Sequence, residues 1–202
     1  MLETVVALTV ILAAVVGPVS LITRGLLSFS VSRNKVIAAN LAQEGIEIVR
    51  LVRENNIACN VLNGPAAWPW NRDPDWATSG RVRAGVDNEG RIVRVRAGVD
   101  IGSFVSVNCV SATLRIPRLS ASCSGPLLFE TDPLLENYGT YGYRSGAATP
   151  FRRCVEIITP PDSPDPDLLP ISDQMDVIST VTWQERSGER SMVLRERLYN
   201  WR

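Results

Sequence analysis

The feature that most constrains this chain is a run of residues without any charge, from Thr4 to Thr23 (TVVALTVILAAVVGPVSLIT). About 20 apolar residues are what an α-helix needs to cross the hydrocarbon core of a membrane. A cleaved secretory signal would start with basic residues and end at a small-residue cleavage site. Here no basic residue precedes the run, and positive charge first appears after it, at Arg24. We therefore expect residues 1–25 to form a transmembrane helix that is retained in the protein.

Two features interrupt this apolar helix. Glu3 lies at its start, where a carboxylate needs a cationic partner if it is buried but is favoured by the helix dipole if it stays in water. Gly17 and Pro18 lie deep inside the run, and a proline there removes one backbone hydrogen bond and clashes with the preceding turn. The pair predicts either a tolerated kink or a short unwound stretch.

Residues 26–56 are expected to continue the same helix as an amphipathic half. The stretch contains no proline, and its only glycine is Gly45. Apolar residues recur every three or four positions, the spacing of one helix face, at Leu27, Val31, Ile37, Leu41, Ile48 and Val52. Glu47 and Arg50, on the opposite face, are three residues apart, which allows a local ion pair. The apolar stripe has to be covered by the rest of the chain.

Residues 57–202 are expected to form a β-rich head domain. Alternating Val and Arg around Asn88-Glu89-Gly90 predict a hairpin over 81–100. Further strands are expected at about 103–117, 126–130, 151–158, 175–184 and 190–199, the last two as a terminal hairpin. A long N-terminal helix packed on such an antiparallel sheet is an α+β fold.

Residues 59–80 lose the helical period and gather Gly, Pro, Asn and Asp, so we expect a loop there. This loop holds three tryptophans, Trp68, Trp70 and Trp76. We expect them to pack the loop against the sheet or the helix. The alternative is a surface contact or stacking platform.

The composition excludes several classes of function. The chain has no histidine, which removes Ser-His-Asp and Cys-His catalysis and every histidine-ligated metal site. We therefore expect no enzyme, no cofactor and no metal. The acidic segment 162–176 contains several prolines and lacks EF-hand spacing, so bound calcium is only an alternative to a stiff loop. The 21 basic and 21 acidic side chains give a formal net charge of zero, so nucleic acid is not expected as the main partner.

Four cysteines, Cys59, Cys109, Cys123 and Cys154, all follow the apolar helix. An even number outside the membrane segment predicts two disulfides, for which three pairings exist. We expect Cys109–Cys123 together with Cys59–Cys154, because this pairing closes one short and one long loop. Buried free thiols are the alternative.

Several segments together resemble one protein family. The opening MLETVVALTVILAAVVGP is similar to the mature N-terminus of type IV pilins and of the pseudopilins of type II secretion, in which a glutamate opens a long apolar helix that contains Gly and Pro. LAQEGIEIVRLVRENN resembles the second half of this helix in minor-pilin-like proteins of candidate phyla radiation bacteria. TPFRRCVEI and VISTVTWQERSGERSMVLRERLYNWR resemble the closing strands of the same group. The resemblance covers residues 1–56 and about 149–202.

The sequence departs from the family pattern in two places. Only Met1 and Leu2 precede Glu3, whereas the family has four residues there after a basic leader that ends in glycine. Either the sequence starts inside the mature protein or its processing differs. Gly17 and Pro18 are adjacent, whereas the family more often separates them.

The resemblance implies a structural subunit with the pilin fold. Its apolar helix holds it in the inner (cytoplasmic) membrane, where a prepilin peptidase processes it and an assembly platform extracts it into an extracellular filament at the cell surface. Other copies then replace the lipid around the helix, which becomes the filament core. The family's methylated N-terminal amine, here that of Met1 or of an upstream residue, neutralises Glu3 of an adjacent subunit. On this interpretation Glu3, Met1, Gly17 and Pro18 are assembly residues.

Two alternatives to a filament subunit stay open. The first is a low-copy minor pilin or pseudopilin of a secretion or DNA-uptake machine. The second is a pilus-borne adhesin or DNA-binding module that uses the tryptophan loop and the arginine-rich hairpin. Salt-dependent binding of DNA by the head would support this second alternative.

Overall fold

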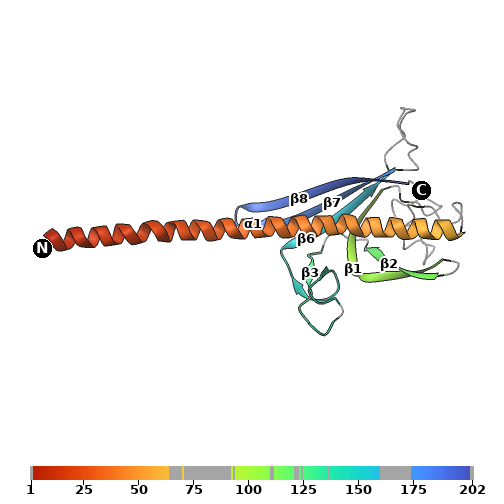
Figure 1. The fold of residues 1–202 in the computed structure, drawn as a ribbon, viewed down its shortest axis with the longest axis horizontal. Helices are drawn as coiled ribbons and strands as arrows, with labels where there is room; N and C mark the ends of the chain where they lie inside the picture. The colour runs from red at the N-terminus through yellow and green to blue at the C-terminus, as the bar shows by residue number, and fades with distance from the viewer. Residues whose placement is uncertain are drawn as a thin grey trace, which may run out of the picture. The chain divides into compact units, whose positions relative to one another are not determined.

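The structure of the chain is a computed structural model. It describes residues 2–63, 70, 92, 94–109, 112–120, 123, 125–135, 137–159 and 174–200, and for residues 23, 27, 62, 63, 97–109 and 112–120 the backbone alone. The chain divides into two units, Met1–Ile37 and Ala38–Arg202. The fold class is α+β, as the sequence predicts, because one long N-terminal helix is followed by an antiparallel sheet (Figure 1).

Helix α1 runs from Leu2 to Asn63. It is longer than the expected helix, which was to end near Asn56. Residues 57–63 (IACNVLN) contain neither proline nor glycine, and Gly64-Pro65 is the first helix-breaking pair to follow. The helical period fades in this last stretch, but nothing in it stops the backbone from continuing.

The main sheet has five antiparallel strands in the order β2-β1-β6-β7-β8. Its strands are β1 (Arg94–Cys109), β2 (Ala112–Ser120), β6 (Phe151–Ile158), β7 (Gln174–Glu185) and β8 (Gly188–Tyr199). The predicted strand 151–158 and the predicted terminal hairpin are confirmed. Gly188 closes that hairpin at a φ of 122°, a conformation that favours glycine.

The expected single strand over 103–117 is wrong. β1 ends at Cys109 and β2 starts at Ala112, and the two strands pair antiparallel with Cys109 opposite Ala112. Apolar and polar residues alternate on both sides of this reversal, so the period alone does not locate it. Of the expected hairpin over 81–100, residues 81–91 lie outside the described residues, and 94–100 belong to β1, which pairs with β2 and β6.

The core of the unit Ala38–Arg202 forms where the second half of α1 packs on the sheet. The buried helix residues recur every three or four positions: Ala38, Leu41, Ala42, Gly45, Ile46, Ile48, Val49, Val52, Arg53, Asn56 and Cys59. They meet the alternate buried positions of β6 and β7, which include Val155, Ile157, Val177 and Val181. The predicted apolar stripe is therefore confirmed over this half of the helix, and the predicted ion pair between Glu47 and Arg50 is present at 2.5 Å.

Helix and sheet approach each other closely at Gly45. A Cβ atom on this residue would lie 2.6 Å from Ser179 Oγ and 3.0 Å from Val155 Cγ2. Beside it, the side chain of Arg153 from β6 is completely buried. Its Nη1 donates to the Leu41 carbonyl at 3.2 Å and lies 3.0 Å from the Glu44 carboxylate. A side chain of α1 wider than a hydrogen atom would have to displace part of this packing.

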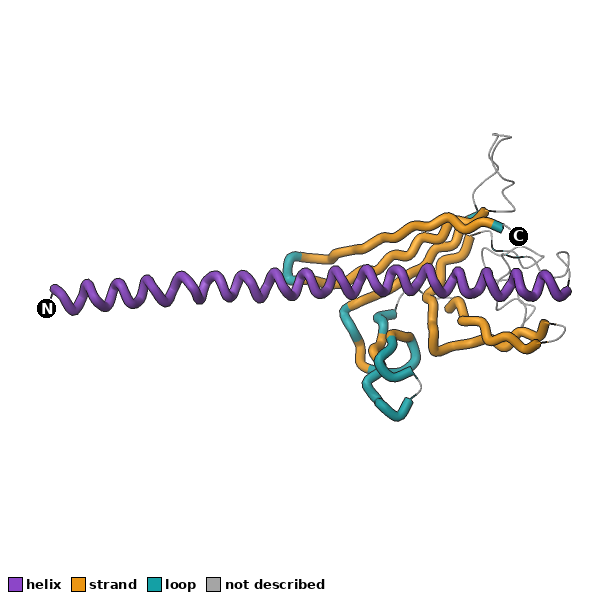
Figure 2. The backbone as a smooth tube through the Cα atoms, in the orientation of Figure 1, coloured by secondary structure: helices purple, strands orange, loops and turns teal. Residues whose placement is uncertain are grey.

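Residues 125–150 leave the sheet before β6 and form a small lobe, here called the excursion (Figure 2). It contains a three-stranded sheet of two-residue strands, β3 (Leu128–Phe129), β4 (Tyr141–Gly142) and β5 (Ala147–Ala148), in the order β4-β3-β5. The Leu127 amide donates to the Phe151 carbonyl at 2.8 Å, and the Tyr143 hydroxyl donates to the Arg153 carbonyl at 2.8 Å. These bonds attach the excursion to the start of β6.

A disulfide between Cys123 and Cys154 closes the excursion, with 31 residues of sequence separation. The expected pairing of Cys109 with Cys123 and of Cys59 with Cys154 is therefore wrong. Loop length does not select a partner, because the partner is set by which strands the fold brings together. Cys59 is also disulfide-bonded and is buried, whereas the side chain of Cys109 lies outside the described ones.

Candidate functional site

The most unusual surface of the chain is the apolar exterior of the unit Met1–Ile37. Every described side chain from Leu2 to Ser30 is exposed. The large apolar ones among them, from Leu2 to Phe29, are 54–84% exposed. Exposed apolar area of this extent marks a surface that contacts lipid or protein.

The apolar side chains of this unit point in every direction around the helix axis. Val10, Ile11 and Leu12 are consecutive, and successive helical residues are about 100° apart at 3.6 residues per turn. A helix that is hydrophobic all round requires an apolar environment on all sides. By length and composition α1 is able to span a membrane: the mean hydropathy of its most apolar window is 2.6, and that window is entirely unburied.

Charge is almost absent from this part of α1. Glu3 is exposed in the first helical turn, where the helix dipole favours its negative charge. The first basic residue of the described chain is Arg24, about 32 Å away along the helix axis at 1.5 Å per residue. Met1, the other expected partner, lies outside the described residues. No side chain of the described part of α1 therefore neutralises Glu3 if this end of the helix enters an apolar environment.

Gly17 and Pro18 lie inside the continuous helix. The short unwound stretch considered for this pair is not present, because α1 is helical on both sides of it and through it. Pro18 has no N–H, so the Ala14 carbonyl lacks its usual helical donor. A Cβ atom on Gly17 would meet nothing within 4 Å, so no contact within the chain requires a glycine there.

The second candidate surface is the outer face of the sheet, the face that points away from α1. It carries two carboxylates, each held by arginines of the neighbouring strand. Asp176 on β7 accepts from Arg195 at 2.5 Å and from Arg197 at 2.7 Å. The hydrogen bond from Arg197 is the main cause that lowers the pKa of Asp176 below its ordinary value, against the opposing effect of burial.

Glu156 on β6 makes the equivalent contacts with β1. Arg94 donates to its carboxylate at 2.9 Å, and Arg96 lies 3.8 Å from it. Arg94 and Arg96 belong to the expected arginine-rich hairpin, which was considered as part of a DNA-binding module. Both are thus paired with a carboxylate. Asp176 is the last residue of the acidic segment considered for calcium. It accepts hydrogen bonds from two guanidinium groups, which disfavours it as a cation ligand. The other acidic residues of that segment, Asp162, Asp165, Asp167 and Asp173, lie outside the described residues.

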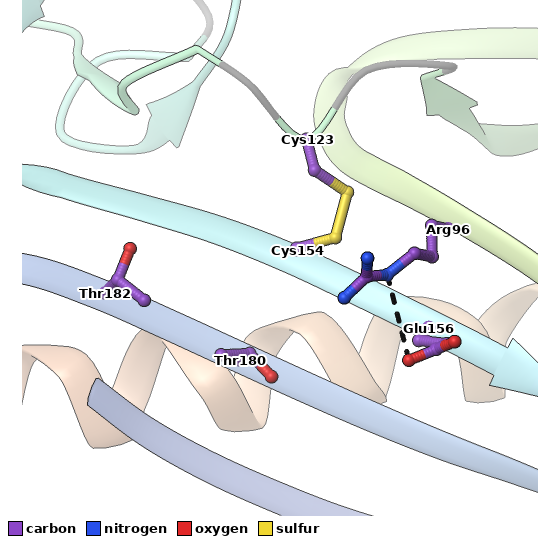
Figure 3. Close-up of a pocket in the computed structure, with 6 residues that line it drawn as sticks. All are labelled: Arg96, Cys123, Cys154, Glu156, Thr180 and Thr182. Atoms are coloured by element: carbon purple, nitrogen blue, oxygen red, sulfur yellow. Dashed lines mark ion pairs between the residues drawn. A yellow bond between two sulfur atoms is a disulfide. The ribbon is translucent and has the colours of Figure 1, made fainter.

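A cavity of about 350 Å³ opens on this outer face beside the disulfide (Figure 3). Six residues line it: Arg96, Cys123, Cys154, Glu156, Thr180 and Thr182. Thr180 and Thr182 stand on β7, next to Cys154 of β6, and Arg96 and Glu156 lie on the other side of the cavity. The alternation of Thr180 and Thr182 with buried Val181 and Trp183 is the sequence signal that places the threonines on this face.

The structure places one of the three loop tryptophans. Trp70 is 4% exposed within the hydrophobic core, and its carbonyl accepts a hydrogen bond from the Asn56 side chain at 3.1 Å. Packing, the expectation preferred for this residue, is therefore confirmed, and a surface contact through Trp70 is wrong. Trp68 and Trp76 lie outside the described residues.

Three exposed apolar side chains of the excursion have no counterpart in the sequence-based candidates. Leu134, Leu135 and Tyr138 are 91%, 43% and 57% exposed. They lie in a turn-rich segment that reads as an ordinary loop, so no sequence signal distinguished them.

The described residues contain no group of three or more acidic, cysteine or histidine side chains that could hold a metal ion. The two candidate surfaces are the apolar exterior of the first unit and the outer face of the sheet. No protein-family model, no curated protein and no solved structure matches this chain.

Proposed function

We propose that this chain is a structural subunit that polymerises through its N-terminal helix into an extracellular, type IV pilus-like filament. The observation that carries the proposal is the apolar exterior of residues 2–30, which is exposed on every side of the helix. A single copy has no apolar partner for this surface among its described residues. A membrane, and then the helices of other copies, would supply one.

In this proposal the subunit is first held in the inner membrane and is processed by a prepilin peptidase. An assembly platform then moves it into the filament, where neighbouring helices replace lipid around the apolar segment. Glu3 enters a dry environment at that step, so it requires a cation from another copy, for example an N-terminal amine. The absence of any basic side chain near Glu3 in the described helix supports an intermolecular partner.

The side of the membrane on which the head lies is a point where two physical signals disagree. Disulfides such as Cys123–Cys154 persist in oxidising compartments, which supports an extracytoplasmic head. The basic residues Arg24, Arg33 and Lys35 follow the apolar run, and the positive-inside rule would keep that flank in the cytoplasm. We give the disulfides greater weight, because the disulfide bonds of Cys59, Cys123 and Cys154 are difficult to maintain in a reducing cytosol.

The only lysine of the chain provides a direct test of this orientation. Lys35 is exposed on α1. We expect a membrane-impermeant amine reagent to modify Lys35 on intact cells before assembly, as read by mass spectrometry. The Lys35→Arg variant should lose this modification while any N-terminal modification remains. Labelling that requires prior lysis of the cells would place the head in the cytoplasm and contradict the proposal.

The filament itself is tested through Glu3. We expect Glu3→Gln and Glu3→Ala to abolish filaments, because the intermolecular ion pair is lost, while the head stays folded. Glu54→Gln is the matched control, since Glu54 is also an exposed carboxylate of α1. Electron microscopy of purified surface filaments, with mass spectrometry of the N-terminus, is the measurement. Filaments of normal length and number from the Glu3 variants would refute the role of this residue.

A low-copy minor pilin is the second form of the proposal, and quantitative mass spectrometry of the same filaments distinguishes it by copy number. The DNA-binding alternative is less favoured. Three arginines of the outer face, Arg94, Arg195 and Arg197, already donate hydrogen bonds to Glu156 or Asp176, which reduces the positive charge that the face offers to phosphates.

A further inference from the structure

The excursion presents an apolar projection, here called the knob, which consists of Leu134, Leu135 and Tyr138. Leu134 is 91% exposed, the most exposed of the large apolar side chains in the described chain. The Leu134 amide donates to Asp132 Oδ1 at 3.0 Å, and the Leu135 amide donates to the Asp132 carbonyl at 3.2 Å. The Tyr138 amide donates to the Leu135 carbonyl at 3.1 Å. The knob is therefore a hydrogen-bonded turn and not a loose loop.

Glu130 fixes the base of this turn. Its side chain is nearly buried, and Oε1 accepts the amides of Thr131 and Asp132, each at 3.0 Å. Its backbone exchanges hydrogen bonds with Thr140 and Gly139, both at 3.0 Å. Because the turn is already ordered, it loses little conformational entropy when the knob binds a partner.

The outer face of the sheet offers a matching recess. We call the cavity lined by the disulfide, Thr180, Thr182, Arg96 and Glu156 the socket. The disulfide and the threonine methyl groups give it an apolar wall, and about 350 Å³ is ample room for a leucine side chain. Arg96 stands at its rim with 72% of its side chain exposed.

The charges of the two surfaces are opposite. The excursion, which carries the knob, contains three acidic residues and one basic residue, Arg144. The described charged residues of the outer face are five arginines against three carboxylates, namely Arg94, Arg96, Arg152, Arg195, Arg197, Glu156, Asp176 and Glu189. Asp132 is exposed beside Leu134, so an incoming knob would bring its carboxylate toward the arginines at the socket rim.

We propose that the knob of one copy docks into the socket of a second copy, with Leu134 against the disulfide and Asp132 facing Arg96. Knob and socket are different patches of one chain. In the proposed array each copy uses its knob with one neighbour and its socket with another, so the contact is heterologous and extends an open array, which is the requirement of a helical filament. The inference rests on the proposed filament and adds a contact between heads to the contact between N-terminal helices.

The contact is tested in filaments assembled from the full chain with a diazirine amino acid at position 134. A second population of the chain is labelled with heavy nitrogen and mixed before assembly, so that cross-links between copies are identified by mass. We expect cross-links from position 134 to peptides that contain Cys154–Glu156 or Thr180–Thr182 of another copy. The same diazirine at Ser187, an exposed residue of the β7–β8 turn, is the control and should not reach these peptides.

Substitutions then separate the apolar contribution from the ionic one. We expect Leu134→Asp to reduce cross-linking from a diazirine at the neighbouring Leu135 about tenfold or more, because it places a charge in the apolar recess. Asp132→Asn keeps the acceptor for the Leu134 amide but removes the charge, and Arg96→Gln removes the opposite charge. Each should reduce cross-linking about two- to threefold at low salt, and their effects should not add, as expected for one ion pair.

The outcomes distinguish this contact from the filament itself. Filaments whose position 134 reacts with other peptides, with lipid or with solvent alone would overturn the docking but leave the filament in place. Failure of the unmodified chain to form filaments would overturn both. Cross-links within one copy would also refute the proposal, because Leu134 does not line its own socket.

Discussion

The two halves of α1 share one backbone conformation, yet their side chains meet opposite environments. Between Leu2 and Ile37 the apolar residues cover the whole circumference, and none of the described side chains is buried. Between Ala38 and Val61 most of them lie on one stripe that the sheet covers, and of the large apolar side chains only Leu51 and Val61 are exposed. The polar side of this second half is engaged too: Arg50 lies 2.5 Å from both Glu47 and Glu196 of β8.

The two halves obtain their stability from different sources. Helices in proteins are stabilised mostly by packing of an apolar face and only weakly by intrinsic propensity. The second half finds that packing within its own chain. The first half has more apolar surface, which the described residues leave uncovered, so its packing differs from that of the second half.

Shortening one leucine in each half should give the largest difference in unfolding free energy between the two halves. Leu41 is 2% exposed and Leu12 is 55% exposed. We expect Leu41→Ala to lower the free energy of unfolding of the head by about 3 kcal/mol, because it leaves a cavity between helix and sheet. Leu12→Ala should leave that free energy unchanged. Urea unfolding of the detergent-solubilised chain, followed by tryptophan fluorescence to which the buried Trp70 and Trp183 contribute, measures both. Equal losses of unfolding free energy in the two variants would contradict this difference between the halves.

Substituting one glycine in each half should give smaller changes in stability. Gly45→Ala places a methyl group 2.6 Å from Ser179 Oγ, and we expect a loss of about 1–2 kcal/mol once the gain in helix propensity is included. Gly17→Ala meets nothing within 4 Å, and we expect it to raise helix stability by up to about 1 kcal/mol. Unfolding curves test the first variant, and helix content by circular dichroism in detergent tests the second. We expect Gly45→Ala to lower stability and Gly17→Ala to raise it, and changes in the same direction would contradict the difference between the halves.

The stability of the head should depend on pH through Asp176. Asp176 has a pKa below its ordinary value because Arg197, and then Arg195, donate to it. A carboxylate of this kind stabilises the fold above its unfolded pKa of about 3.9, and this contribution is lost as the pH falls through the lower folded pKa.

We expect Asp176→Asn to cost about 1 kcal/mol between pH 5 and 7, and less as the pH drops below about 4. Unfolding of both proteins at a series of pH values is the measurement. A difference between the two proteins that stays constant down to pH 2 would show that the ion pair with Arg197 does not set the pKa of Asp176.

The sequence was informative where a periodic pattern repeats over many residues. The stripe through Leu41, Ile48 and Val52 is buried as predicted, and the alternation along 151–158 and 175–199 gave β6 and the β7–β8 hairpin. In each case the side-chain period follows directly from backbone geometry. The apolar run was equally clear, since length and absence of charge define it without any knowledge of the fold.

Contacts between distant segments could not be predicted in the same way. The disulfide partner of Cys154 and the burial of Arg153 beside Leu41 depend on which strand faces which helix. An arginine in a strand is ordinarily solvent-exposed, so nothing in its own neighbourhood marks Arg153 as a core residue. The knob was missed for the opposite reason, because apolar residues in a turn-rich stretch give no period at all.

The disulfide that closes the excursion has a consequence for proteolysis. Arg144 is an exposed residue between Cys123 and Cys154, in the part of the head with the shortest strands. Trypsin-like cleavage at this arginine would open the backbone, but both fragments would remain joined through the two sulfur atoms. The excursion would thus stay attached to β6 through Cys154. In the proposed extracellular filament, a cut in the chain at this point would therefore not remove the lobe.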